Sequence, residues 1–354
     1  METKEQKIKL TQYAHGGGCG CKIAPAVLQE ILKTNTTPLF SDQLLVGNST
    51  NDDAAAFDLV NGTVLISTTD FFLPIVDDPF DFGRIAAANS ISDVYAMGAK
   101  PLMAIAILGW PVEKLPIAAA QQVLEGARAI CAEAGIPLAG GHSIDTTEPV
   151  FGLAVTGLCE IGHLKKNNNA KEGDVLFLTK PIGVGILATA QKRGVLSAEH
   201  LDILTRQMTQ INRIGEQLGK IEGVHALTDV TGFGLAGHLI EMAEGSGVTA
   251  ELSYSQIHVT EGVREYIAQK IVPDATYRNW NAYGSKISFE PGVDVMEAFT
   301  LLPDPQTNGG LLISVSEAAA EEVIALLDEN GLSSFIQPVG RMIAKQEKVI
   351  VVKP

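Results

Sequence analysis

The sequence has few cysteines and no apolar stretch long enough to cross a membrane. Its 354 residues include four cysteines, too few for a disulfide framework in a chain of this size, which favours a reduced, cytoplasmic setting. Residues 1–10 are charged and polar, unlike a secretory signal. The longest apolar stretch, residues 101–112, falls well short of the roughly 20 residues that span a bilayer. We therefore expect a cytoplasmic protein that does not enter a membrane.

Positive charge is also scarce. Lys and Arg number 26 against 41 Asp and Glu, which gives a formal net charge of −15. This sign argues against extended contact with nucleic acid or an anionic membrane, because both are negatively charged. A small anionic substrate is still compatible with it if bound cations offset the repulsion locally. Hydrophobic residues make up 46%, enough for a core, and the length favours two domains or one large one.

The common glycine signatures of nucleotide-binding proteins are missing. No Gly-x-x-x-x-Gly-Lys-Ser/Thr occurs, which argues against a P-loop. The glycines at 16–20 do not follow a strand and lack the dinucleotide-binding spacing, and kinase-type signatures are absent. A nucleotide site in this chain must therefore belong to another family.

The order of apolar patterns predicts two mixed α/β domains, α+β in character, after a glycine-rich arm. The polar, turn-rich residues 165–173 are the best linker candidate. We therefore expect a mobile arm over residues 1–24 and domains over residues 25–164 and 165–354. In each domain, a sheet would be covered by helices rather than doubly wound.

In the first domain, Asn61-Gly62 between two apolar runs is the strongest hairpin signal. It predicts paired strands over 54–60 and 63–69. Gly98 is placed to end a helix over 81–97. The remaining predicted elements are helices over 25–32 and 118–134 and strands over 102–108, 136–139 and 150–158. In the second domain, we expect strands at 175–179, 225–230, 248–252, 311–315 and 335–340 and helices at 183–192, 198–218 and 233–243.

Five acids have a context that suggests a cation site. Asp52 and Asp53 precede the first hairpin strand, while Asp70 and Asp229 each end an apolar run. Acids at the ends of neighbouring strands can lie in one site and bind the same Mg²⁺ ion, which prefers hard oxygen ligands. Singly, each is more simply explained as a turn former or helix cap. Asp93 differs, because it lies inside a helical pattern where neither explanation applies.

Two further glycine turns could bind phosphate. Residues 139–143 (Ala-Gly-Gly-His-Ser) follow a predicted strand, and residues 229–234 (Asp-Val-Thr-Gly-Phe-Gly) lead into a predicted helix. Both could direct backbone N–H groups at phosphate oxygens. Both could equally be tight turns with no ligand, and the sequence does not favour either interpretation.

The loop from His15 to Lys22 is the most informative segment. Cys19 lies among four glycines, close in sequence to Lys22 and His15. A nearby cation lowers the pKa of a thiol and raises its nucleophilic fraction. A metal site on Cys19 and Cys21 is an alternative, although a closed zinc site needs four ligands and no second cluster is visible. A merely flexible tail would not need Cys-Gly-Cys-Lys.

These segments together resemble the selenophosphate synthetases (selenide, water dikinases), a family within the aminoimidazole-ribonucleotide-synthetase-like ATP-binding superfamily. The resemblance covers nearly the whole chain in order, and the Cys-Gly-Cys-Lys loop is its specific part. Two departures are visible: some relatives have selenocysteine where this chain has Cys19, and Asn308 stands where Ser is commoner. The segments that carry the resemblance are 13–25, 45–48, 52–55, 67–72, 81–87, 91–94, 139–145, 228–234 and 304–310.

The resemblance implies an activity and a site. The reaction would convert ATP, selenide and water into selenophosphate, AMP and orthophosphate. Cys19 would handle the selenium nucleophile and Lys22 would contact the ATP phosphates, so these two residues are the expected catalytic pair. The magnesium ligands would be Asp53, Asp93 and Asp229, for more than one Mg²⁺ ion. The other ATP contacts would be Thr50, Asn51, Asp52, Asp70, Asp93, Gly141, His142 and Ser143.

The resemblance also implies partners. The family is usually homodimeric, with the ATP site near the subunit interface, and a monovalent cation or a selenium-delivery protein would be compatible with it. Two rival hypotheses stay open at this point. One is another ATP-dependent kinase or synthetase of the superfamily, which would have no use for the Cys-Gly-Cys-Lys loop. The other is a selenium- or metal-binding carrier with a vestigial nucleotide fold.

Overall fold

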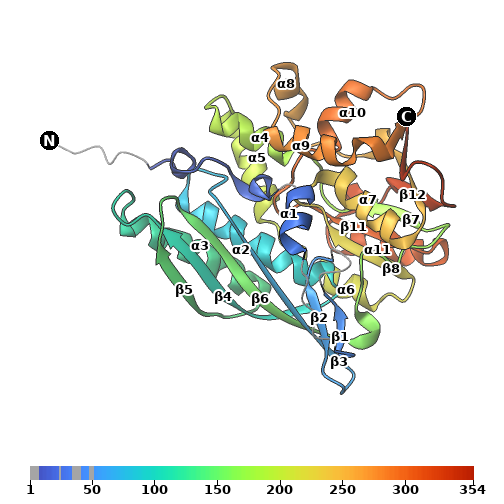
Figure 1. Ribbon diagram of the computed structural model, residues 1–354, viewed down its shortest axis with the longest axis horizontal. Helices are drawn as coiled ribbons and strands as arrows, with labels where there is room; N and C mark the ends of the chain where they lie inside the picture. The colour runs from blue at the N-terminus through green and yellow to red at the C-terminus, as the bar shows by residue number, and fades with distance from the viewer. Residues whose placement is uncertain (1–7, 24, 34–40, 48–51) are drawn as a thin grey trace.

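The computed structural model describes residues 8–23, 25–33, 41–47 and 52–354, and it contains two mixed sheets that lie side by side (Figure 1). The first sheet has six strands in the order β1-β2-β3-β6-β4-β5. Neighbouring strands are antiparallel except for the parallel pair β4–β5. The strands are β1 (Leu44–Val46), β2 (Ala55–Asp58), β3 (Thr63–Phe72), β4 (Lys100–Trp110), β5 (Leu138–Asp145) and β6 (Val150–Glu160).

The predicted hairpin is confirmed. β2 pairs with β3 in antiparallel register, with Asp58 opposite Val64. The turn is tight because Gly62 has φ +84° and the Asn61 side chain accepts a hydrogen bond from the Thr63 amide at 3.0 Å. Asn and Gly tolerate these turn conformations better than other residues. β3 runs three residues further than predicted and therefore contains Asp70.

Two long helices, α2 (Pro79–Ala96) and α3 (Ile117–Ala134), pack against each other, and α2 lies on β3 and β6 (Figure 1). α2 begins two residues before its predicted start because the Asp78 side chain caps the amide of Asp81 at 3.1 Å. It ends at Ala96, one residue before its predicted end, and Gly98 follows with φ +71°. A short helix, α1 (Pro25–Leu32), matches its prediction.

The second sheet has seven strands in the order β10-β13-β9-β12-β7-β11-β8. Its strands are β7 (Val175–Leu178), β8 (Val224–Asp229), β9 (Thr249–Ser253), β10 (Ile287–Phe289), β11 (Leu311–Val315), β12 (Gly340–Ile343) and β13 (Ile350–Lys353). Its helices are α4 (Val184–Lys192), α5 (Ala198–Thr209), α6 (Ile214–Lys220), α7 (Gly234–Ser246), α8 (Val263–Ala268), α9 (Asp274–Tyr283), α10 (Val295–Leu301) and α11 (Ala320–Glu329).

Two predictions for the second domain are wrong. The helix predicted over 198–218 is two helices, α5 and α6, separated at residues 210–213. The strand predicted over 335–340 begins only at Gly340, and residues 333–335 form a 3₁₀ turn. Apolar periodicity did not resolve these short, partly buried segments. The predicted α+β class, with mixed sheets covered by helices, is confirmed.

Helix α2 joins the two sheets. Beyond its own sheet it contacts α5, α6 and β8, so nearly all of its residues from Phe82 to Ala96 are buried. The predicted linker also packs closely, since Lys165 and Asn167 are buried and Lys166 forms a bridge to Ala226 of β8. The contact between the two halves therefore includes the buried polar residues Lys165 and Asn167.

The described part of the predicted arm is packed against the body. The Leu10 side chain is fully buried, and its amide donates to the Asp77 carbonyl at 3.2 Å. The Gly18 amide donates to the Leu73 carbonyl at 3.0 Å. Residues 8–23 thus pack beside the segment that follows β3. In the part of the chain that the structure describes, no helix combines the length and apolarity required to span a bilayer.

Candidate active site

The structure brings the predicted acids together where α2 meets β8. Asp93 lies inside α2, Asp229 ends β8, and Asp70 lies in β3. Asp53 and Asp52 precede β2. The charge of Asp229 acts on both Asp53 and Asp93, which places these three carboxylates in one site. Acids separated by 176 positions in the sequence (53 to 229) thus converge through the contact between the two halves.

Hydroxyl groups fix the two buried carboxylates. Thr68 of β3 donates to Asp93 at 2.5 Å, and Ser92 of α2 donates to Asp229 at 2.5 Å. Asn212 in turn donates to the Ser92 hydroxyl at 2.8 Å. Each donor leaves other carboxylate lone pairs available, because an ionised carboxylate accepts about four hydrogen bonds.

The outer carboxylates are fixed in the same way. Thr228 donates to Asp53 at 2.9 Å, and Asn89, one turn before Asp93 on α2, donates to Asp70 at 2.6 Å. The Asn167 amide donates to Asp52 at 2.7 Å, so Asp52 also anchors the segment between the domains. Neighbouring side chains and one backbone amide therefore hold these acids in place.

The electrostatics of the cluster favour a cation. Desolvation, followed by the charge of Asp229, raises the pKa of Asp53 well above its usual range. Desolvation and the charge of Asp70 do the same to the pKa of Asp93. Burial raises the pKa of Asp229 to about 6, against the opposing effects of the Ser92 hydrogen bond and the Lys22 charge. Like charges that are out of water repel, and a bound cation removes this penalty.

The donor set fits Mg²⁺. The Asp53 Oδ2 atom is buried without a hydrogen-bond partner among the described residues, although buried carboxylate oxygens are normally paired. Within residues 8–23, 25–33, 41–47 and 52–354, no three His, Cys, Asp or Glu side chains by themselves form a metal-binding group. Mg²⁺ commonly takes one or two carboxylates and completes its shell with water and substrate phosphate. The acids would thus form part of its shell.

Lys22 reaches the same site from the loop. Its ammonium group lies 5.9 Å from the centre of the Phe233 ring, next to α7. Its charge lowers the pKa values of Asp229 and Glu241. Burial nevertheless raises the pKa of Glu241 to about 7. Lys22, the cationic residue predicted for the site, therefore acts electrostatically on the acids there.

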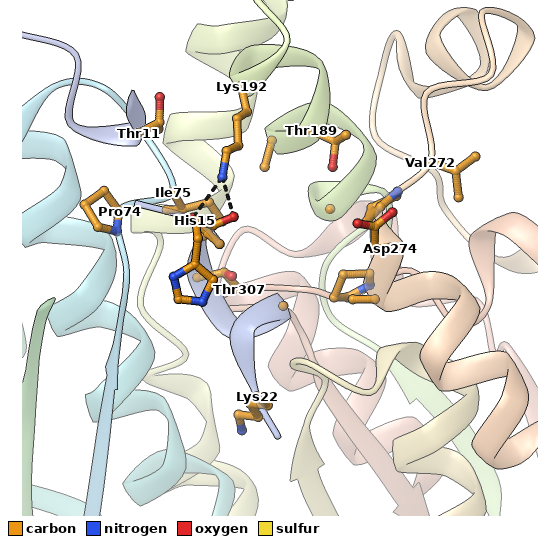
Figure 2. Close-up of a pocket in the computed structure, with 18 of the residues that line it drawn as sticks. Thr11, His15, Lys22, Pro74, Ile75, Thr189, Lys192, Val272, Asp274 and Thr307 are labelled. Atoms are coloured by element: carbon orange, nitrogen blue, oxygen red, sulfur yellow. Dashed lines mark hydrogen bonds between the residues drawn. The ribbon is translucent and has the colours of Figure 1, made fainter. Parts of the chain in front are cut away.

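The loop that carries Lys22 needs glycine at one position above all. Gly18 has φ +54°, and an added Cβ would lie 2.4 Å from Ile75 Cδ1 and 2.5 Å from Thr307 Oγ1. Residues 18–21 form a 3₁₀ turn. Beyond the loop lies a cavity of about 690 Å³, lined by residues of the loop, α4 and α9 (Figure 2).

Three of the predicted site residues cannot be placed in full. Thr50 and Asn51 lie outside the described residues. The backbone of Cys19 belongs to the 3₁₀ turn, but its side chain lies outside what the structure describes. Cys131 and Cys159, expected in the core, are buried free thiols.

The turn predicted at Gly141, His142 and Ser143 is wrong, because all three lie within β5 and are exposed. Gly141 pairs with Ala106 of β4, and an added Cβ would lie 2.2 Å from the Ala106 carbonyl oxygen. The glycines thus allow the strand to continue. A strand edge also presents backbone N–H groups, so an ATP contact there remains a prediction. The other predicted turn, 229–234, does lead into α7 as expected.

Asn308 connects the domains. Its amide donates to Asn89 of α2 at 2.7 Å, and its side chain donates to the carbonyl groups of Met208 and Gln210 at 2.7 and 2.9 Å. Its φ of +50° is one that Asn tolerates better than most residues. This residue therefore has a structural role between α2 and α5.

Sequence reasoning missed the residues that support the acids. Lys180 is buried and donates to the carbonyl groups of Gln210 and Asn308 at 2.7 and 2.9 Å, and burial lowers its pKa to about 7. A lysine two residues after the apolar strand β7 was the available signal. Thr68, Ser92 and Thr228 each lie one or two residues from a predicted acid, so a search for hydroxyls beside those acids would have found them.

Family models match most of the chain. The model described as AIR synthase related protein, N-terminal domain, matches residues 51–159. The model described as AIR synthase related protein, C-terminal domain, matches residues 171–353.

Curated relatives agree in name and cover nearly the full length. The selenide, water dikinase of Colwellia psychrerythraea is 56% identical over 338 residues, which is 95% of this chain and 96% of that protein. The enzyme of the same name from Aeromonas hydrophila is 53% identical, covering 96% of each chain. That from Haemophilus influenzae is 52% identical, covering 99% of each.

Solved structures share the fold at low identity. Thiamine-monophosphate kinase from Stenotrophomonas maltophilia has a TM-score of 0.64 at 20% identity, covering 88% of this chain and 91% of that one. The hydrogenase maturation protein HypE in complex with ATP has a TM-score of 0.61 at 18% identity, covering 97% and 93%. At these identities the likeness shows the fold alone.

Proposed function

Because the chain belongs to the selenide, water dikinases, within the AIR synthase-related proteins, we propose that its acid cluster and glycine loop carry out that reaction. ATP, selenide and water would give selenophosphate, AMP and orthophosphate. The observation that carries this assignment is the convergence of Asp53, Asp93 and Asp229 with Lys22 at one site.

The acids would hold the metal-bound nucleotide. Asp53, Asp93 and Asp229 are the proposed Mg²⁺ ligands, and the unpartnered Asp53 Oδ2 supports this role. Asp52, Asp70 and Asp93 would contact ATP or its bound ions, together with Thr50, Asn51 and residues 141–143. Bound Mg²⁺ supplies charge neutralisation of the phosphates, and more than one ion suits this number of acids.

The loop would supply the reacting groups. Lys22 is the proposed phosphate contact, because its charge already acts at Asp229. Cys19 is three residues away and is the proposed selenium-handling group. A packed loop also excludes water, which would otherwise compete with selenide for the first phosphoryl transfer. The proposal also includes a monovalent cation and a selenium-delivery protein, as the family resemblance implies.

A homodimer is proposed through the first sheet. One face of this sheet is covered by α2, and its other face exposes Phe71, Met103 and Ile105, each 44–54% exposed. These residues lie on β3 and β4, the two strands that flank β6, and apolar groups exposed on one sheet face are typical of protein–protein contacts. A second copy on this face would place the exposed β5 residues 141–143 near the interface. Sedimentation of Ile105→Asp, which should be monomeric if this face is used, tests the dimer.

Nucleotide product analysis tests the function. Purified protein with Mg²⁺ and ATP should form AMP and two phosphate products, one of them selenophosphate, only when selenide is added. ADP as the sole nucleotide product would instead favour another kinase of the superfamily. Undetectable ATP binding would favour the carrier hypothesis. A cytoplasmic, reducing location also stays a prediction, supported by the free thiols of Cys131 and Cys159.

A further inference from the structure

The glycine loop is held in place from both domains by three charged side chains. Lys192 lies at the end of α4, Arg278 lies on α9, and Glu148 lies between β5 and β6. None of the three was singled out by the sequence or by the family resemblance. All three contact the main chain of residues 14–20, and their contacts lie on both sides of Cys19.

Lys192 binds the start of the loop. Its Nζ atom donates to the carbonyl oxygens of Ala14, His15 and Gly16 at 3.0, 2.9 and 3.3 Å. Figure 2 shows this side chain extending from α4 to His15, with Lys22 at the other end of the loop. Three donors on one ammonium match three consecutive carbonyl groups. Such convergence fixes the path of a backbone that its glycines would otherwise leave free.

Arg278 binds the loop beyond Cys19. Its Nη2 atom donates to the Gly20 carbonyl at 2.7 Å. In the described part of the chain neither Lys192 nor Arg278 forms an ion pair with a carboxylate. Their recorded hydrogen bonds therefore go to the loop.

Glu148 holds the loop from the first domain. Its carboxylate accepts from the His15 amide and from the His15 ring, each at 2.7 Å. The His15 hydrogen bond lowers the pKa of Glu148, and the charges of His15 and Lys192 add to this effect. Lys192 and Glu148 thus bind the same residue from opposite domains.

We propose that Lys192, Arg278 and Glu148 are positioning residues, which hold the backbone around Cys19 so that Lys22 faces the acid cluster. None of them reaches the cluster, so they act through the loop. These three residues, which we call the tether, come from both domains. The position of the loop therefore depends on how α4 and α9 are arranged relative to the first sheet. This inference rests on the proposed function for its kinetic consequences, but the position of the loop can be measured without any activity.

Tryptic cleavage after Lys22 measures release of the loop. The full-length protein and its Lys192→Met variant are digested under native conditions. Peptides that end at Lys22 are quantified by mass spectrometry, because trypsin also cuts after Lys4, Lys7 and Lys9. Loss of three charge-assisted hydrogen bonds should speed cleavage by about tenfold. Lys192→Arg, which keeps the charge and the donors, should be cleaved at nearly the wild-type rate.

The neighbouring Arg193 supplies a matched control. It lies next to Lys192, but among the described residues it donates no recorded hydrogen bond to the loop. Arg193→Met removes the same charge from the same helix end and should leave cleavage after Lys22 unchanged. If Lys192→Met proves unstable on heating, Arg278→Met provides the same comparison from the opposite side of Cys19.

Steady-state kinetics supply the second measurement. In Lys192→Met, kcat for selenide-dependent AMP formation should fall about tenfold while KM for ATP changes by less than about threefold, because the acid cluster is intact. Wild-type cleavage and wild-type kcat in Lys192→Met would overturn the proposal. A wild-type protein that forms no selenide-dependent AMP would refute the proposed function, while the cleavage assay would still report on the tether.

Discussion

The acid cluster and the glycine loop face each other across the candidate site, but they are built differently. Asp93, Asp70 and Asp229 lie on α2, β3 and β8, and Asp52 and Asp53 precede β2. Asp229 and Asp93 are 1% and 6% exposed, and hydroxyl groups fix both. The loop is held by exposed charged side chains and by backbone contacts. The buried acids belong to the core, whereas the contacts that hold the loop are mostly exposed.

The largest effect should come from the acid side. Asp93→Asn keeps the shape but removes one charge from the proposed Mg²⁺ shell, and we expect kcat/KM to fall by about a thousandfold. The metal-free protein should be as stable as wild type or more so, because a like-charge repulsion is relieved. Kinetics and thermal unfolding without Mg²⁺ measure both effects.

Asp202→Asn is the control for this change, because Asp202 pairs with Arg206 on the exposed face of α5. It should change neither measurement. Near-normal activity in Asp93→Asn would remove Asp93 from the proposed metal site.

The loop should respond to Gly18→Ala with a smaller loss. The added methyl group meets Ile75 and Thr307 at a positive φ, which costs about 1–3 kcal/mol and displaces the turn that contains Cys19. We expect a ten- to hundredfold lower kcat with normal binding of Mg²⁺–ATP. Calorimetry of nucleotide binding separates the two quantities.

Gly20→Ala is the matched control, since its added Cβ would have only ordinary contacts from 3.7 Å outward. Equal losses in the two variants would show that the loop tolerates no side chain anywhere, and the specific role of Gly18 would be lost.

The connection between the domains should show itself in stability. Asn308→Ala removes the two hydrogen bonds to the Met208 and Gln210 carbonyl groups and places alanine at a φ of +50°. We expect a loss of about 2–3 kcal/mol in the free energy of unfolding, measured in urea. Asn308→Gly, which relieves the backbone strain, should lose less. An unchanged unfolding midpoint in Asn308→Ala would argue against this role.

The smallest expected effect is a pH dependence of the stability of the metal-free protein, which arises from the acid cluster. The folded pKa of Asp229 is raised to about 6, above its unfolded value, so the folded state binds the extra proton. The resulting stabilisation is complete below about pH 4 and is lost as the pH rises through about 6. Melting temperatures of the metal-free protein should therefore carry a downward contribution from pH 5 to 7. Saturating Mg²⁺ should reduce that slope.

Asp229→Asn should flatten the same profile, because the titrating carboxyl group is gone. A wild-type slope in this variant would assign the pH dependence to other groups, such as Glu241, whose pKa is raised to about 7.

The sequence predicted the elements that local chemistry specifies. Asn61-Gly62 specified the hairpin, Gly98 followed the end of α2, and the helical pattern correctly placed Asp93 inside α2. Prediction failed where local signals were weak or misleading. Gly140-Gly141 suggested a turn, yet pairing with β4 keeps this segment extended. Short helices such as α6 could not be separated from their neighbours by periodicity alone.

The sequence by itself identified the family, the candidate acids and the glycine loop with Cys19 and Lys22, because these depend on residue types in a fixed order. Only the tertiary structure decided which side chains surround them. Ser92 meets Asp229, and Lys192, Arg278 and Glu148 meet the loop, over separations of 130 residues or more. Such contacts follow from the packing of the two halves against each other, and no local pattern in the sequence encodes them.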